Sequence, residues 1–383
     1  MKFTISKKDL LNALKLALIN PAERVKDYAL ITCNPRENRI TLQSTDGAMH
    51  LKSFIPIEPG GVSGSAILPI GTTILALSDL PKTAKILTLT RIKDTLCVTS
   101  DGCDKLILPV IETVDDFPDF PDLPDVPLYS SEDTILWTGE AELAALLDKV
   151  TYALPKTKER ENFDCVLLES CGEHIGYSLT ATDGYRLARA AGYADCISGN
   201  LENTPLLLPG PCVRILRKML KTYADAVFLQ KDDLLAVYRG AHLLVCPLAS
   251  KVHYPDYRSV IPEDLPPEEG ISIEREDLIV ALKHLLPSSQ KPDYGVIFTA
   301  ESDELTVSAL FDESPKVNIA AFYKGGCKSF ALNAKYVLDA VKQIPDAKIT
   351  LDSGWDEDPV RIRTNNPDTL ILIKPLRCPV RAA

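Results

Sequence analysis

Residues 3–19 read FTISKKDLLNALKLALI, a short alternation of apolar and polar residues followed by a helical pattern. Residues 135–154 (ILWTGEAELAALLDKVTYAL) and 271–286 (ISIEREDLIVALKHLL) open in the same way. In each stretch, leucines or other apolar residues recur every three or four positions, as in an amphipathic helix. The apolar positions are Leu10, Leu11, Leu14 and Leu18; Leu143, Leu146, Leu147 and Val150; and Leu278, Leu282 and Leu285. The sequence therefore predicts a unit that occurs three times and opens with a strand and a helix.

A second pattern of strand, helix and strand follows in each repeat, at residues 67–89, 206–229 and 330–351. Each repeat is thus expected to hold two β-α-β-β-β units with mostly antiparallel strands, an α+β fold. Proline- and acid-rich seams separate the repeats, and they contain FPDF at 117–120 and YPDY at 254–257. Proline keeps such connections extended. The predicted domains are 1–128, 129–262 and 263–383.

The tetrapeptides STDG (44–47) and ATDG (181–184) also repeat. A hydrolase could use Asp46 or Asp183 with a histidine or cysteine as the base. His50 follows Asp46 by four residues, but Ala188 stands near the corresponding place in the second copy. Asp-Gly tolerates the positive φ of a tight turn, so a shared turn is favoured over a duplicated active site.

The composition is that of a water-soluble globular chain, with 45% hydrophobic and 25% charged residues among 383. No apolar run reaches the length of a membrane span, and the first residues lack a signal-peptide pattern, so a cytoplasmic location is expected. The ten cysteines and five histidines show no metal-ligand spacing. The glycine-rich stretch at 58–65 lacks the lysine of a nucleotide-binding loop. We expect no metal, no cofactor and no catalytic residue.

The net charge is −11, yet cations gather on predicted helices. Such faces could bind a polyanion such as DNA through its phosphates, without sequence preference, while the acidic remainder repels it. A merely solvated face is the alternative. The richest set lies opposite Val213, Leu216 and Leu220 at helical spacing and consists of Arg214, Arg217, Lys218 and Lys221. Lys15 and Lys149 lie on two other predicted helices.

Six motifs in order resemble the bacterial DNA polymerase III beta subunit, the sliding clamp. They are the N-terminal MKFTI, FPDF (117–120), TATDGYRLA (180–188), SKVHYPDYRSVIP (250–262), NAKYVLDAV (333–341) and LIKPLR (372–377). The resemblance implies a clamp fold of three repeated domains, with helices inside and antiparallel sheets outside a ring. It also implies a non-catalytic head-to-tail homodimer that encircles duplex DNA and tethers the replicative polymerase. Arg24 matches a basic position of the family's DNA-facing surface.

The family binds partner peptides in an apolar pocket between the second and third domains. The implied partners are the polymerase III alpha subunit, the clamp loader, other DNA polymerases and repair proteins; no membrane is involved. By motif, the pocket residues here are Phe163, Thr182, Gly184, Tyr185, Arg186, Leu187, Pro255, Val260, Tyr336, Leu372, Pro375, Leu376 and Arg377.

Some residues depart from the family pattern. Ser259 stands where many members have an arginine, Lys374 replaces an apolar residue, and CPVRAA follows Arg377. These departures bear on which peptides are preferred. A divergent clamp-like scaffold that binds peptides without encircling DNA, or a mobile-element copy of the clamp, therefore remains the alternative reading.

Overall fold

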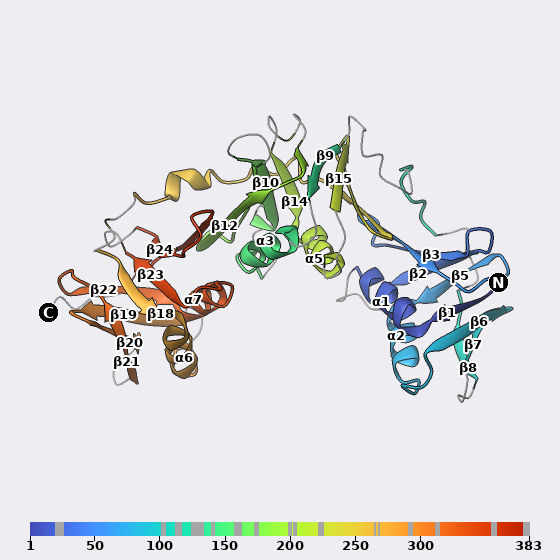
Figure 1. Cartoon of the computed structure of the whole chain (residues 1–383), viewed down its shortest axis with the longest axis horizontal. Coiled ribbons are helices and arrows are strands. Elements are labelled where there is room, and N and C mark those ends of the chain that lie inside the picture. The colour runs from blue at the N-terminus through green and yellow to red at the C-terminus, as the bar shows by residue number, and fades with distance from the viewer. Residues whose placement is uncertain are drawn as a thin grey trace. The chain divides into compact units, whose positions relative to one another are not determined.

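The computed structural model is drawn in Figure 1. It describes residues 1–19, 27–100, 105–111, 117–123, 134–138, 142–156, 163–171, 176–197, 201, 205–220, 226–263, 266, 269–289, 294–310, 315–353 and 358–377. Within these ranges no helix combines the length and the apolar character needed to cross a bilayer. The chain divides into two compact units. Unit 1 comprises Met1–Ala141, Ala194–Asn203 and Pro211–Ala249, and unit 2 comprises Glu142–Tyr193, Thr204–Gly210 and Ser250–Ala383.

Unit 1 holds two antiparallel sheets. The order in one is β1-β6-β7-β8, and the order in the other is β13-β9-β15-β16-β17-β4-β3-β2-β5. Figure 1 shows α1 and α2 side by side beneath the second sheet. The elements are β1 (Lys2–Ser6), α1 (Lys7–Ala17), β2 (Tyr28–Asn34), β3 (Arg39–Thr45), β4 (His50–Pro56), β5 (Gly64–Pro69), α2 (Ile70–Ser78), β6 (Ile86–Ile92), β7 (Thr95–Thr99), β8 (Leu106–Pro109), β9 (Thr134–Thr138), β13 (Cys196–Ile197), α5 (Gly210–Met219), β15 (Ala226–Lys231), β16 (Leu234–Arg239) and β17 (His242–Pro247).

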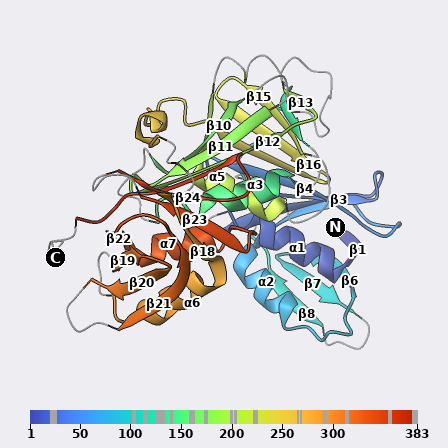
Figure 2. The same ribbon diagram turned by 60° about the vertical axis from the view of Figure 1, so that its left-hand side comes forward.

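Unit 2 is built on one sheet with the order β14-β10-β11-β12-β25-β24-β23-β18-β21-β20-β19-β22. Figure 2 shows α6 and α7 lying side by side on this unit. The elements are α3 (Glu142–Thr151), β10 (Cys165–Ser170), β11 (Gly176–Thr182), β12 (Arg186–Tyr193), β14 (Leu206–Pro209), the 3-10 helix η3 (Tyr257–Val260), β18 (Ile271–Glu274), α6 (Arg275–Leu285), β19 (Gly295–Glu301), β20 (Glu304–Ala309), β21 (Lys316–Phe322), β22 (Lys328–Asn333), α7 (Ala334–Val341), β23 (Lys348–Asp352), β24 (Val360–Arg363) and β25 (Thr369–Ile373).

The predicted repeat is confirmed. The opening strand and helix occur as β1 and α1, β9 and α3, and β18 and α6. The second pattern occurs as β5-α2-β6, β14-α5-β15 and β22-α7-β23. The named strand pairings, all between described strands, are antiparallel, as expected for an α+β fold. Elements of the middle repeat fall in both compact units. The domain limits at 128 and 262 stay a prediction, and position 128 lies outside the described residues.

Local sequence explains how the first helix begins and what it buries. In β1 the alternating residues Phe3 and Ile5 are buried. Ser6 then caps α1, since its hydroxyl accepts a hydrogen bond from the Asp9 amide at 3.4 Å. The helix buries Leu10 and Leu14 against the sheet. Alternation followed by a cap and a leucine stripe therefore produces the strand and helix that the sequence predicted.

Candidate functional site

The second Thr-Asp-Gly turn joins β11 to β12. The Thr182 hydroxyl donates to the Arg186 carbonyl at 2.7 Å and accepts from the Gly184 amide at 3.1 Å. One Asp183 carboxylate oxygen accepts from the amides of Tyr185 and Arg186, both at 3.0 Å. Gly184 adopts a φ of +83°, which glycine reaches without steric cost. The local sequence thus fixes a tight turn that presents Tyr185 and points Arg186 inward.

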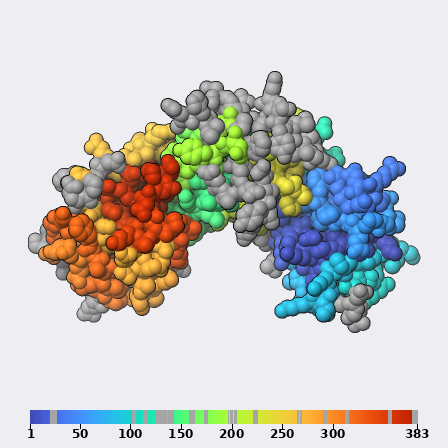
Figure 3. Space-filling view, in the orientation of Figure 1, coloured from blue at the N-terminus to red at the C-terminus, as the bar shows by residue number. Residues whose placement is uncertain are grey.

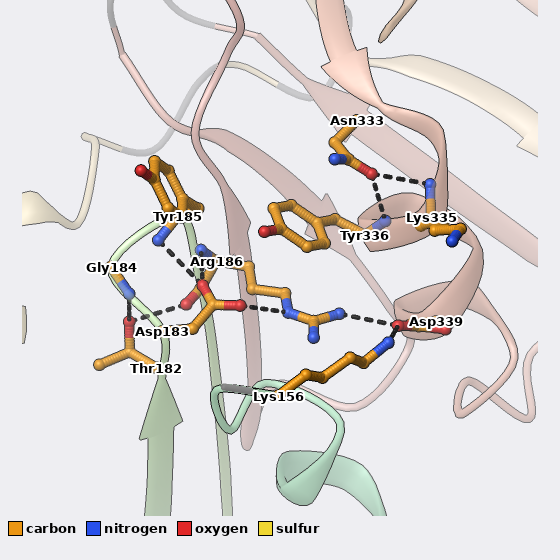
Figure 4. A network of polar contacts seen from close by, with 10 residues as sticks. All are labelled: Lys156, Thr182, Asp183, Gly184, Tyr185, Arg186, Asn333, Lys335, Tyr336 and Asp339. Atoms are coloured by element: carbon orange, nitrogen blue, oxygen red, sulfur yellow. Dashed lines mark hydrogen bonds and ion pairs between the residues drawn. The ribbon is translucent and has the colours of Figure 1, made fainter. Parts of the chain in front are cut away.

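Arg186 is buried, with 3% of its surface exposed, and its guanidinium is held by two carboxylates. Its Nε donates to Asp183 at 2.9 Å, and Nη1 donates to Asp339 of α7, also at 2.9 Å. Lys156 reaches the same Asp339 oxygen at 3.0 Å. The guanidinium carbon lies 4.5 Å from the centre of the Tyr336 ring. Figure 4 shows this network joining the turn to α7.

Electrostatics favour the ionised form of Asp339. Burial by itself disfavours the carboxylate, but hydrogen bonds from Arg186 and Lys156, with the charges of both, outweigh burial and hold the pKa of Asp339 below its ordinary value. Burial raises the pKa of Tyr152, the other aromatic residue near the guanidinium. The two cations of the network thus favour the charged carboxylate of Asp339.

A cavity of about 520 Å³ opens beside the turn, and nine of the predicted pocket residues line it. They are Phe163, Thr182, Gly184, Tyr185, Arg186, Leu187, Pro255, Val260 and Leu372. Tyr185 and Val260 are 45% and 48% exposed, so two of its apolar surfaces are open to solvent. Figure 3 shows that the C-terminal strands, in red, reach the surface of unit 2 on the face drawn.

Four of the predicted pocket residues do not line the cavity. Tyr336 stacks on Tyr185, which lines the cavity, with ring centres 6.4 Å apart. Its place on α7 is fixed by Asn333, whose side chain accepts from the amides of Lys335 and Tyr336. The other three follow β25. Pro375 and Leu376 are half-buried, and Arg377 is exposed.

The YPDY segment lines the cavity with more residues than the predicted Pro255 and Val260. Among the additional lining residues, the sequence had marked Ser259 and Lys374 only as departures from the family pattern. Asp256, Tyr257, Ser259, Ile261 and Pro262 line the cavity, as do Asp358, Pro359 and Lys374. The segment is held in place by buried Glu169 of β10, which accepts hydrogen bonds from the Tyr257 hydroxyl and, at 2.7 Å, from Arg258. The Tyr254 hydroxyl donates to the Thr180 carbonyl at 3.0 Å. In the sequence, only the motif YPDYR indicated that this segment belongs to the site. No motif near Glu169 indicated its role.

Five of the seven basic residues predicted to face DNA lie on three described helices. Arg214, Arg217 and Lys218 are exposed along α5, whereas Val213 and Leu216 of this helix are buried, as is Leu220 just after its end. Lys15 is exposed on α1. Lys149 on α3 is half-buried and lines a small hollow of about 40 Å³. Arg24 and Lys221 lie outside the described residues.

The turn is poorly suited to hydrolysis. Both oxygens of Asp183 accept hydrogen bonds from the turn or from Arg186, so this carboxylate is occupied. His50 packs edge-on against Phe120, and burial lowers its pKa, although Asp46 opposes the shift. Across the part of the chain that the structure describes, no group of three or more histidine, cysteine or acidic residues could hold a metal ion.

Comparison with known proteins identifies relatives of the chain. No protein-family model matches it. The beta sliding clamp of Chlamydia pneumoniae is 26% identical over 238 residues, 62% of this chain and 63% of that protein, so the match spans less than two thirds of this relative. The beta sliding clamp of Bacillus subtilis is 22% identical over 404 aligned positions, which cover 98% of this chain and all of that protein.

A solved structure gives the fold. The Helicobacter pylori beta clamp bound to a DNA ligase peptide superposes with a TM-score of 0.80 at 19% identity, covering 98% of this chain and 100% of that one. The chain therefore has the sliding-clamp fold, as the sequence motifs implied. Its sequence is similar to those of bacterial beta sliding clamps.

Proposed function

We propose that the chain is a DNA sliding clamp, in which two copies join head to tail and encircle duplex DNA. The observation that carries this proposal is the correspondence of fold with a beta clamp over 98% of the chain. A closed ring holds DNA by topology, so mobile contacts to phosphates are enough and no catalytic group is required. The ring would tether the replicative polymerase and so make synthesis processive.

Strand pairing within the chain supports a head-to-tail contact. The third strand after the first helix of one repeat pairs with the last strand of the next, as β4 with β17 and β12 with β25. The corresponding strands left over are β21 of the third repeat and β8 of the first. Among the described strands, β8 pairs only with β7, and β21 pairs with β20 and, at its end, with β18. A second copy could pair its β8 with this β21.

Exposed apolar side chains lie beside both open strands. In unit 1, Ile107 of β8 is 59% exposed, and Leu75 is 64% exposed on α2, which packs against β8. In unit 2, Phe322 of β21 is 57% exposed, and Val280 is 49% exposed on α6, which packs against β21. Apolar surface of this kind is typical of a protein interface. Two different patches favour a heterologous contact.

The basic helices supply the proposed DNA contacts. Arg214, Arg217 and Lys218 expose three cations on one helix, and Lys15 and Lys149 add two more. We also propose that Arg24 and Lys221 contact DNA, because the sequence predicts it. Because such contacts go to phosphates, they would be independent of base sequence and would weaken with salt.

We also propose that the cavity beside the turn binds short peptides of partner proteins. The H. pylori clamp was solved with a DNA ligase peptide. Here the cavity has apolar walls with a few polar groups, which suits an extended or turned peptide. The proposed partners are the polymerase III alpha subunit, the clamp loader, other polymerases and repair proteins.

The decisive experiment measures oligomeric state and retention on circular DNA. We expect a dimer at micromolar concentration, and a protein that stays on nicked circular DNA after loading by a clamp loader and slides off once the DNA is linearised. Ile107→Lys should yield monomers, whereas the control Val62→Lys, at another exposed apolar residue, should not. A wild-type monomer that no loader retains on DNA would overturn the clamp function. If that monomer still bound partner peptides, the scaffold alternative would hold.

A further inference from the structure

Lys374 places a positive charge on the wall of the apolar cavity. It directly follows β25, and its backbone amide donates to the Tyr185 carbonyl at 2.8 Å, which fixes its position next to the turn. Its side chain is exposed and lines the cavity. Within the described ranges, the Lys374 ammonium forms no ion pair. Among the described residues, the cavity therefore presents a cation that is not held in an ion pair.

The other cation of the wall differs from Lys374 in this respect. The Arg186 guanidinium is buried and bonded to Asp183 and Asp339, so it has little charge left to offer a ligand. Of the two lining cations, Lys374 is the one available to a partner. Because an ammonium group on a flexible stem can follow a ligand into the cavity, it suits an ion pair with a bound peptide.

Two acidic residues restrict where a ligand's negative charge could lie. Asp256 also lines the cavity, and it accepts a hydrogen bond from the Arg258 amide at the start of η3. Asp358 precedes β24, and pairing of Val360 with Ile373 places it near the same end of the sheet as Lys374. Either carboxylate would repel an acidic ligand group. A peptide carboxylate is therefore favoured where it meets Lys374 and disfavoured beside Asp256 or Asp358.

We propose that Lys374 selects partner peptides that carry one side-chain carboxylate beside their apolar anchor residues. This inference rests on the proposed peptide-binding function. The apolar walls provide affinity through burial, and the pairing of unlike charges at a partly sheltered surface provides selectivity. Lys374 is thus a specificity-determining residue of the cavity.

The test uses fluorescein-labelled, C-terminally amidated short peptides built from Leu, Phe and Ser, with Asp placed at each position in turn. Each has a matched peptide with Asn in place of Asp, so the side chain carries the only variable charge. Fluorescence anisotropy on the full-length protein gives the affinities. We expect Asp to be preferred over Asn by about five-fold at one position, the size of an ion pair near a protein surface.

Variants of the protein separate the effect of the Lys374 charge from the binding provided by the rest of the cavity. Lys374→Met should abolish the Asp preference while still binding the Asn peptide, and Lys374→Glu should favour a peptide with Lys at that position. Lys231→Met, which removes an exposed lysine of β15 that does not line the cavity, should behave as wild type. Equal affinities for Asp and Asn peptides in wild type would overturn this inference alone. If no peptide of the set, and no DNA ligase peptide, bound at all, the proposed peptide site itself would fail.

Discussion

The turns at residues 45–49 and 182–186 make the same set of hydrogen bonds. In the first turn the Thr45 hydroxyl donates to the Met49 carbonyl at 2.8 Å and accepts from the Gly47 amide at 3.0 Å. One Asp46 oxygen accepts from the amides of Ala48 and Met49. The second turn repeats each of these bonds with Thr182, Asp183 and Gly184. Their backbones are set by the shared Thr-Asp-Gly.

The turns differ in the further contacts of the aspartate carboxylate. Asp46 is exposed, whereas Asp183 is only 7% exposed and uses its second oxygen to hold Arg186. Met49 stands where the second turn has Arg186, and it is simply buried. Arg186, the second residue after the shared motif, thus converts a local turn into the anchor of a network that reaches α7. The comparison teaches that the motif determines the geometry of the turn, and that Arg186 links this turn to the rest of the site.

The largest expected difference between the two turns is in the stability lost when the aspartate of each turn is replaced. Asp183→Ala leaves the buried Arg186 with one carboxylate partner fewer, and it should destabilise unit 2 by about 3–5 kcal/mol. Asp46→Ala removes only hydrogen bonds within the turn and should cost about 1 kcal/mol in unit 1. Hydrogen exchange measured by mass spectrometry on β11–β12 and on β3–β4 compares the two losses within one method. Equal losses of protection would mean that the Arg186 network contributes nothing beyond the turn.

The sequence revealed the turn but not this network. Thr-Asp-Gly is a local signal, because its bonds join residues at most four apart. Asp339 is far from Arg186 in the sequence, and only the folding of α7 beside β12 brings the two together. Glu169 beneath the YPDY segment was missed for the same reason. Ion pairs between residues far apart in the sequence leave no spacing pattern. A single sequence therefore predicts the repeat, the turn and the YPDY segment, but not the ion pairs that hold the turn and the segment in place.

A smaller effect should follow from Asp339→Asn, which keeps the shape but weakens the bond to Arg186. Asp339 does not line the cavity, yet Tyr336 and Tyr185 stack beside this network. We expect roughly ten-fold weaker peptide binding, since a hydrogen bond between charged groups contributes about 1.5–3 kcal/mol. Lys156→Met, at a side chain that is 69% exposed, should change affinity less than about two-fold. Unchanged affinity in Asp339→Asn would limit the network to a role in stability.

Acid titration tests the same carboxylate. The pKa of Asp339 is depressed in the folded protein, so its contribution to stability is complete above the ordinary value of 3.8 and is lost as the pH falls through the lower folded value. Wild type should therefore lose more stability than Asp339→Asn on acidification below that ordinary value. Thermal unfolding followed at successive pH values measures the difference. Parallel curves for the two proteins would show that Asp339 is not preferentially ionised by folding.

The smallest difference is expected at the threonines, where the two turns are alike. Thr45→Val and Thr182→Val each remove one hydroxyl that donates to a carbonyl and accepts from a glycine amide, so each should cost about 1 kcal/mol. Exchange rates of the Gly47 and Gly184 amides report the loss at both turns in parallel experiments, with the unchanged turn as the internal control. A similar acceleration of hydrogen exchange at both amides would show that the difference between the turns arises from Asp183 and Arg186. A much larger effect at Gly184 would mean that the burial of Thr182, which is 6% exposed, already makes the second turn stronger before Arg186 is considered.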